Sequence, residues 1–223
     1  TLRALSDASM QHLADAVGAP EGSLVLFNPN GFPLSDAVSF TPPGGMVSVL
    51  DGDTPLPCQQ LSDGRVSLFV RDVPARGYKT LYLSSAPAPE AEALRVTAGE
   101  MENRFFRLRL NEKGQFTSIF DKRAGRELIP AGERANVLMT YEDKPHNYDA
   151  WDVNNYYKEK SWEVDDVQSI EAVDCGAVSA SLRIVRRYLE SSITQTVTLY
   201  RDIPRIDIRN QIDWKEKQIF LKD

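Results

Sequence analysis

Residues 105–120 read FFRLRLNEKGQFTSIF. Apolar and charged side chains alternate at the start of this stretch, so positions 106, 108 and 110 face one way and both arginines face the other. The polar residues 111–114, which end in glycine, are typical of a hairpin turn, and 115–120 can return beside the first strand. This stretch therefore predicts an antiparallel hairpin with one face in a core.

The same period of two continues over longer stretches towards residue 223. Over 193–199 the apolar side chains share a face with Gln195, and over 206–214 they share a face with Asn210. Charged and amide side chains occupy the opposite face of the second stretch. Long strands with one wet face are typical of antiparallel sandwiches. We therefore assign residues 94–223 to a large β domain.

The first part of the chain combines one helix with a smaller β domain. Apolar residues recur every three or four positions over 2–17, which predicts a helix that ends before Gly18 and Pro20. Short alternating stretches separated by turn residues then predict strands at 23–28, 46–50, 65–71 and 78–84. We place the small β domain at 20–86 and a Pro- and Ala-rich linker at 87–93. The fold class is mainly β.

Composition excludes several classes of protein. The chain has 223 residues, of which 42% are hydrophobic and 26% charged, as in globular domains. A net charge of −6 argues against nucleic-acid binding. Its apolar runs, such as 24–27, are too short to span a membrane, and no secretory signal is visible. We favour reduced thiols for Cys58 and Cys175, and hence a cytoplasmic location, although sequence leaves a single disulfide open.

The densest group of candidate functional residues lies at 141–157. It combines carboxylates, amides and aromatic rings, the mixture that binds sugars by ring stacking and hydroxyl hydrogen bonds. A long surface crossover whose aromatic residues plug a sandwich edge explains the same composition equally well. Asp149 and Asp152 also suggest the paired carboxylates of glycosidases, but sequence spacing in a loop does not fix their separation. His146 lies in this segment, whereas His12 fits a helix-surface or core position better than a ligand position.

The runs of charge have a simpler interpretation. Arg183, Arg186 and Arg187 lie on one predicted strand, and we expect them to form a solvated, salt-bridged face. Residues 215–217, which read KEK, are expected to continue the wet side of their strand.

Three stretches resemble the C-terminal β region of glycoside hydrolase family 38, the zinc-dependent retaining α-mannosidases. They are VLFNPN at 25–30, the hairpin at 101–114 with its continuation through 118–122 and 125–127, and EDKPHNYDAWD at 142–152. The last is the most specific, because it is similar to the Asp-x-Pro…Trp-Asp-Ala-Trp-Asp stretch of the cytosolic, vacuolar and bacterial branch. Tyr148 stands where that branch usually has tryptophan.

The resemblance implies a particular architecture. Residues 1–19 correspond to the end of a helical bundle, and 20–86 to the small β domain that follows it. Residues 94–223 correspond to the first part of a galactose-mutarotase-like supersandwich. In this family the zinc ligands and catalytic carboxylates lie in an N-terminal domain and at the start of the bundle. No segment here matches those motifs, so we expect no catalytic residue and no metal ligand in this chain.

The resemblance also implies a function. We expect a non-catalytic fragment that supports and partly walls the mannose site of an α-mannosidase whose zinc is bound elsewhere. The expected substrate-binding residues are His146, Tyr148, Asp149, Trp151 and Asp152. Expected partners are an α-mannoside and the missing N-terminal catalytic domain, without nucleic acid or membrane. Exposed strand edges could also allow homo-oligomers.

Other functions remain open on sequence. One is a stand-alone carbohydrate-binding module, and another is a purely structural or interaction domain. A mutarotase-type enzyme is less favoured, because His146 would have to serve almost alone. Linkage specificity and oligomeric state do not follow from the sequence.

Overall fold

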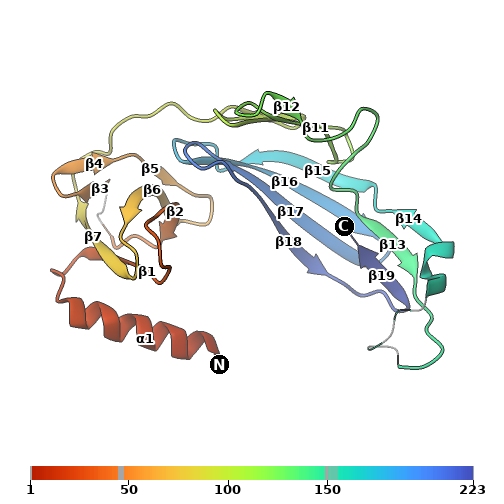
Figure 1. The fold of residues 1–223 in the computed structure, drawn as a ribbon, viewed down its shortest axis with the longest axis horizontal. Coiled ribbons are helices and arrows are strands. Elements are labelled where there is room, and N and C mark those ends of the chain that lie inside the picture. The colour runs from red at the N-terminus through yellow and green to blue at the C-terminus, as the bar shows by residue number, and fades with distance from the viewer. Residues whose placement is uncertain (1, 45–47, 149–150, 152, 154, 223) are drawn as a thin grey trace. The chain divides into compact units, whose positions relative to one another are not determined.

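The computed structural model describes residues 2–44, 48–148, 151, 153 and 155–222. The chain forms two compact units (Figure 1). Unit 1 comprises Thr1–Glu92 with Gly176–Val178, and unit 2 comprises Ala93–Cys175 with Ser179–Asp223. Among the described residues, no helix is long and apolar enough to cross a membrane.

Unit 1 contains the helix and two small antiparallel sheets. Helix α1 (Leu2–Val17) confirms the helix predicted at 2–17. The strands are β1 (Ser23–Asn28), β2 (Leu34–Phe40), β3 (Ser48–Asp51), β4 (Thr54–Leu56), β5 (Cys58–Gln60), β6 (Val66–Val73) and β7 (Gly77–Ser84). Their order is β1-β7-β3-β4 in one sheet and β2-β6-β5 in the other. Strand β2 has no counterpart among the predicted strands, because a register shift between Leu34 and Asp36 breaks the alternation.

A small apolar core holds unit 1 together. Val49, Leu68 and Leu81 are each 0% exposed and come from both sheets. Burial of each such side chain contributes roughly 1.5–3 kcal/mol. Asn28 holds the turn after β1, because its side-chain nitrogen donates to the carbonyl of Phe32 at 2.8 Å and its oxygen accepts the Asn30 N–H at 3.0 Å. Much of helix α1 keeps its apolar side chains exposed, with Leu2 at 87% and Leu5 at 67%.

Unit 2 contains three antiparallel sheets. The first has the order β12-β11-β10-β9-β8, the second β14-β13-β19 and the third β15-β16-β17-β18. The first sheet is built from β8 (Val96–Thr97), β9 (Glu100–Glu102), β10 (Phe106–Leu110), β11 (Phe116–Asp121) and β12 (Arg126–Glu127). The others use β13 (Met139–Glu142), β14 (Ser161–Glu163), β15 (Asp166–Val173), β16 (Ser179–Tyr188), β17 (Ser191–Tyr200), β18 (Ile206–Asp213) and β19 (Ile219–Lys222).

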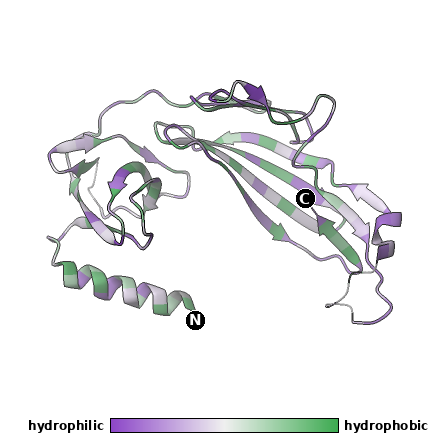
Figure 2. Ribbon diagram, viewed as in Figure 1, coloured by the Kyte–Doolittle hydropathy of each residue, from purple (hydrophilic) through white to green (hydrophobic). Residues whose placement is uncertain are grey.

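The main core of unit 2 lies between its first and third sheets. Leu108 from β10 and Leu182, Val197 and Leu199 from β16 and β17 are all 0% exposed in one cluster. Apolar and polar residues alternate along β16–β18 in Figure 2. The hairpin predicted at 105–120 is confirmed as β10 and β11, whose apolar face enters this core. Two sheets that share a core in this way are consistent with the expected sandwich.

The prediction of a solvated arginine face is wrong for Arg186. Its side chain is 1% exposed, because it shares the inward face of β16 with Ile184 and Leu182. One guanidinium nitrogen donates to the Gln195 side chain at 2.5 Å, and another donates to the carbonyls of Lys113 at 2.8 Å and Gly114 at 3.1 Å. Arg183 lies on the other face and pairs with Glu171 at 2.8 Å, as expected.

The prediction for residues 215–217 is also wrong, because β18 ends at Asp213 and these residues form a connection. Glu216 bonds to the β16–β17 turn, where its carboxylate accepts the Glu190 N–H at 3.0 Å and the Ser191 hydroxyl at 2.8 Å. This contact ties the connection to the end of the third sheet.

Candidate functional site

The segment predicted to bind sugar is a long loop, 143–160, that leaves β13 and returns into β14. Its two ends are joined where the Glu142 N–H donates to the Lys160 carbonyl at 3.2 Å. The Asp143 N–H donates to the Gln218 carbonyl at 2.8 Å, which ties the loop to the segment before β19. Because β13 pairs with β14 on one side and β19 on the other, the loop starts from a fixed position.

An aromatic cluster anchors the returning half of this loop. The short 3-10 helix η1 (Asn155–Glu159) carries Tyr157, whose ring lies edge-on to Tyr141 with centroids 5.2 Å apart. The Tyr157 ring also packs against Phe220 at 5.8 Å. Tyr141 and Phe220 face each other across β13 and β19, so both lie on one face of that sheet. The loop therefore rests on a rigid base of aromatic side chains.

Glu142 joins the two ends of the loop through ion pairs. Its carboxylate accepts hydrogen bonds from Lys144 at 2.7 Å and Lys160 at 3.0 Å, one from each end of the loop. These two ammonium groups hold the pKa of Glu142 below its usual range. The carboxylate therefore stays ionised at neutral pH. This state suits its ion pairs with the two lysines and does not suit a general acid.

Three of the five predicted site residues, His146, Tyr148 and Trp151, are exposed on this loop. Trp151 is 91% exposed and Tyr148 is 78% exposed, and His146 is also exposed. The Trp151 N–H donates to the Tyr148 carbonyl at 2.7 Å, so the backbones of these two residues lie close together. Tyr148 has a φ of 61°, a conformation that is unusual for a bulky residue. Asp149 and Asp152 lie outside the described residues.

Two observations on the described residues concern metal binding and the state of the carboxyl groups. They contain no group of three or more His, Cys, Asp or Glu side chains that could hold a metal ion. Within the same described ranges, every carboxyl group whose pKa departs clearly from its usual value is shifted downwards, namely Asp63, Asp121, Glu127, Glu142 and Glu163. A glycosidase general acid requires a raised pKa. Cys58 and Cys175 are free thiols.

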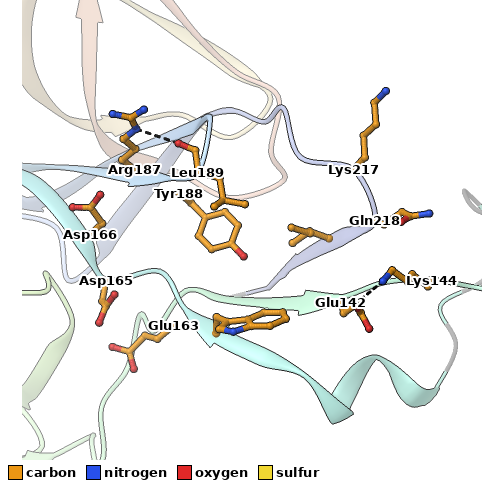
Figure 3. A pocket seen from close by; sticks show the side chains of 12 residues that line it. Glu142, Lys144, Glu163, Asp165, Asp166, Arg187, Tyr188, Leu189, Lys217 and Gln218 are labelled. Carbon is orange, nitrogen blue, oxygen red and sulfur yellow. Dashed lines mark hydrogen bonds and ion pairs between the residues drawn. The ribbon is translucent and has the colours of Figure 1, made fainter.

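Apart from the loop, unit 2 contains a cavity of about 660 Å³, which we call the Trp162 cavity. Trp162, Glu163, Arg187, Tyr188, Leu189 and Ile219 are among the residues that line it. In Figure 3 the Tyr188 ring projects towards its interior, with Glu163 and Asp165 on one side and Glu142 on the other. Trp162 is half exposed, and Tyr188 stacks on Trp214 with centroids 5.8 Å apart and planes inclined by 4°.

This cavity is a feature that the sequence-based reasoning missed. Its walls come from four separate segments of the chain, around Glu142, Trp162, Tyr188 and Ile219. A weak signal was available, since Trp162 stands at the start of a strand just after the aromatic loop. Tyr188 also precedes a two-residue turn.

Comparison with known proteins gives the family. Residues 101–222 match the family model described as "Glycosyl hydrolases family 38 C-terminal domain". The chain belongs to this family. The match begins at β9 and includes both the loop and the Trp162 cavity.

Curated relatives of this family 38 chain are named as α-mannosidases. Alpha-mannosidase 2C1 of Mus musculus is 29% identical over 184 residues, which cover 75% of this chain and 17% of the mouse protein. Alpha-mannosidase 2C1 of Homo sapiens is 27% identical over 168 residues, which cover 71% of this chain and 16% of the human protein. The chain thus spans less than a fifth of the length of these relatives.

A solved structure shares the fold. The crystal structure of an α-mannosidase from Enterococcus faecalis V583 aligns with 98% of this chain and 33% of its own length, with a TM-score of 0.64. Sequence identity is 15%, so the likeness concerns the fold alone.

Proposed function

We propose that this chain is a non-catalytic β region of a zinc-dependent, retaining α-mannosidase, in which it supports the catalytic domain and forms part of the wall of the mannose site. Its family membership and the names of its relatives support the activity. The proposed role rests mainly on the exposed aromatic residues of the loop. Trp151 is 91% exposed, and the base of the loop is fixed to the sheet. An exposed ring on a rigid base is suited to stack on a sugar or to dock beside one.

The proposal places zinc and both catalytic carboxylates outside this chain. The described residues contain no group of three or more His, Cys, Asp or Glu side chains that could hold a metal ion. The chain covers at most 17% of the two 2C1 relatives, which leaves ample length for a separate catalytic domain. We derive no catalytic step from residues of this chain.

The finer features of the architecture belong to the same proposal. We assign unit 2 to a galactose-mutarotase-like supersandwich and helix α1 to the end of a helical bundle. The exposed Leu2 and Leu5 are the side chains that neighbouring bundle helices would cover. We also assign the protein to the cytoplasm, in line with its two free cysteines.

The decisive test is kinetic and uses the full-length mannosidase that contains this chain. Trp151→Ala is expected to lower kcat/KM for an aryl α-mannoside about tenfold, equivalent to about 1.4 kcal/mol, without changing Tm. Phe32→Ala is the matched control, because Phe32 is also exposed, at 59%, but lies in unit 1. Unchanged kinetics in both Trp151→Ala and Asp152→Ala would contradict the proposed role and favour a structural or interaction domain.

A further inference from the structure

Trp162 lies on the opposite face of its sheet from the aromatic rings at the base of the loop. Thr140, Trp162 and Leu221 are paired across β13, β14 and β19, so their side chains share one face. Tyr141 and Phe220, which hold the loop base, lie one position further along and point to the other face. The Trp162 ring and the aromatic rings of the loop base therefore lie on opposite faces of one sheet, and Glu142 and Lys144 belong both to the cavity and to the loop base.

Two aromatic side chains give the cavity fixed flat surfaces. Tyr188 is held by its stack on Trp214, and both pack against a small core that includes Leu138 and Ile193. Trp162 is held by its strand, where its carbonyl accepts the Thr140 hydroxyl at 3.2 Å. In the part of the chain that the structure describes, the Tyr188 hydroxyl and the Trp162 indole N–H have no hydrogen-bond partner in the protein. Both donors are therefore available to a ligand.

The charges around the cavity nearly balance. Four carboxylates and three cationic side chains line it, and several are already paired within the protein. Glu142 pairs with Lys144 at 2.7 Å, and Asp165 pairs with Lys113 at 2.7 Å. A balanced rim disfavours a strongly charged ligand. Aromatic surfaces with polar groups around them suit a neutral ligand that has both apolar faces and hydroxyl groups.

The rim of the cavity also holds two strained residues. Leu189 has a φ of 49° and Gln218 a φ of 55°, although neither is glycine. The left-handed conformation costs roughly 1–2 kcal/mol for such residues. Leu189 is also 59% exposed, so its side chain recovers little of that cost by burial. Leu189 opens the two-residue turn between β16 and β17, where a positive φ is the usual geometry.

We propose that the Trp162 cavity binds a saccharide unit of a neutral α-linked manno-oligosaccharide, separately from the aromatic loop. The choice of mannose rests on the proposed function, whereas the saccharide class rests on the cavity itself. A volume of about 660 Å³ lies within the usual range of small-molecule sites. Trp162 and Tyr188 are the stacking surfaces, and the Asp166 carboxylate lies within the lining as a hydroxyl acceptor.

The test follows the three tryptophan indole N–H signals of this chain by NMR during titration with α-linked mannotriose. The Trp162 signal is expected to shift with a saturable, millimolar dependence, and the same dependence should fit the neighbouring Trp214 signal. A Trp162 signal that stays still throughout the titration overturns the inference. A shift confined to Trp151 also overturns it, because the sugar would then bind at the loop.

A pair of matched variants locates the contact. Tyr188→Phe keeps the stack on Trp214 but removes the hydroxyl, and it should raise the Kd about three- to tenfold. Tyr141→Phe makes the same change on the other face of the sheet and should leave the Kd unchanged. Equal Kd values in both variants and the wild type would overturn the inference. The proposed function is tested separately, by the kcat/KM of Trp151→Ala. The proposed function and the proposed saccharide site can therefore fail independently of each other.

Discussion

A guanidinium nitrogen of Arg186 donates to the Gln195 side-chain oxygen at 2.5 Å in the core of unit 2. Arg186 is 1% exposed and Gln195 is 0% exposed. Gln195 is held in turn by Asn136, with which it exchanges two amide hydrogen bonds at 3.0 and 2.9 Å. Through Lys113 and Gly114, Arg186 also fixes the β10–β11 turn, so one buried side chain connects the two sheets of the sandwich.

Arg186→Leu should therefore destabilise unit 2 by about 2–4 kcal/mol, because the buried Gln195 and Gly114 acceptors and the part-buried Lys113 carbonyl lose this donor. Urea unfolding followed by circular dichroism measures the change. Arg183→Leu on the same strand is the matched control and should stay within about 1 kcal/mol, since its ion pair with Glu171 is exposed. Comparable losses of unfolding free energy in the two variants would show that Arg186 does not connect the two sheets.

Gly114→Ala should be more harmful than the same change at Gly125. Both glycines have positive φ, 70° and 64°. At Gly114 an added Cβ would also meet the Arg186 guanidinium at 2.7 Å and Ile184 at 2.8 Å, whereas at Gly125 it would meet nothing within 4 Å. We expect a loss of about 1 kcal/mol at Gly125 and at least about 2 kcal/mol at Gly114. Thermal melts of the two variants should rank in that order, and the reverse order would contradict the packing at the turn.

Glu163 should make stability depend on acid pH. Its pKa is held below the ordinary value of 4.5 by a hydrogen bond from Gln115 and by ion pairs with Arg134 and Lys113. A carboxyl group with a lowered folded pKa stabilises the fold above its unfolded pKa, and this stability is lost as pH falls through the folded value. The wild type should therefore lose stability below about pH 4.5. Glu163→Gln should flatten that slope in urea titrations at pH 7 and pH 3.5, and an unchanged slope would rule out the linkage.

Periodicity predicted the elements whose side chains alternate cleanly. Helix α1, the β10–β11 hairpin and the buried face of β17 follow directly from the spacing of apolar residues. Strand β2 was missed because its register shift interrupts the alternation. Arg186 was misread because arginine is seldom buried, although its position in the alternation already placed it beside Ile184.

The loop and the Trp162 cavity also differ in how far local sequence predicts them. The loop is a continuous segment rich in aromatic and acidic residues, so composition alone draws attention to it. The cavity depends on Trp162 and Ile219 of one sheet lying beside Tyr188 of another sheet, which no local pattern encodes. Tertiary contacts of this kind become visible only once the register of the sheets is known.

The central claim is that the chemistry lies outside this chain, and hydrolysis of an aryl α-mannoside tests it most directly. The purified 223-residue chain is supplied with zinc and compared with the full-length protein that contains it under the same conditions. The account predicts enzymatic turnover by the full-length protein and none above background by the chain. Turnover by the chain at an enzymatic rate would contradict it, and the catalytic carboxylates would then have to lie within these residues.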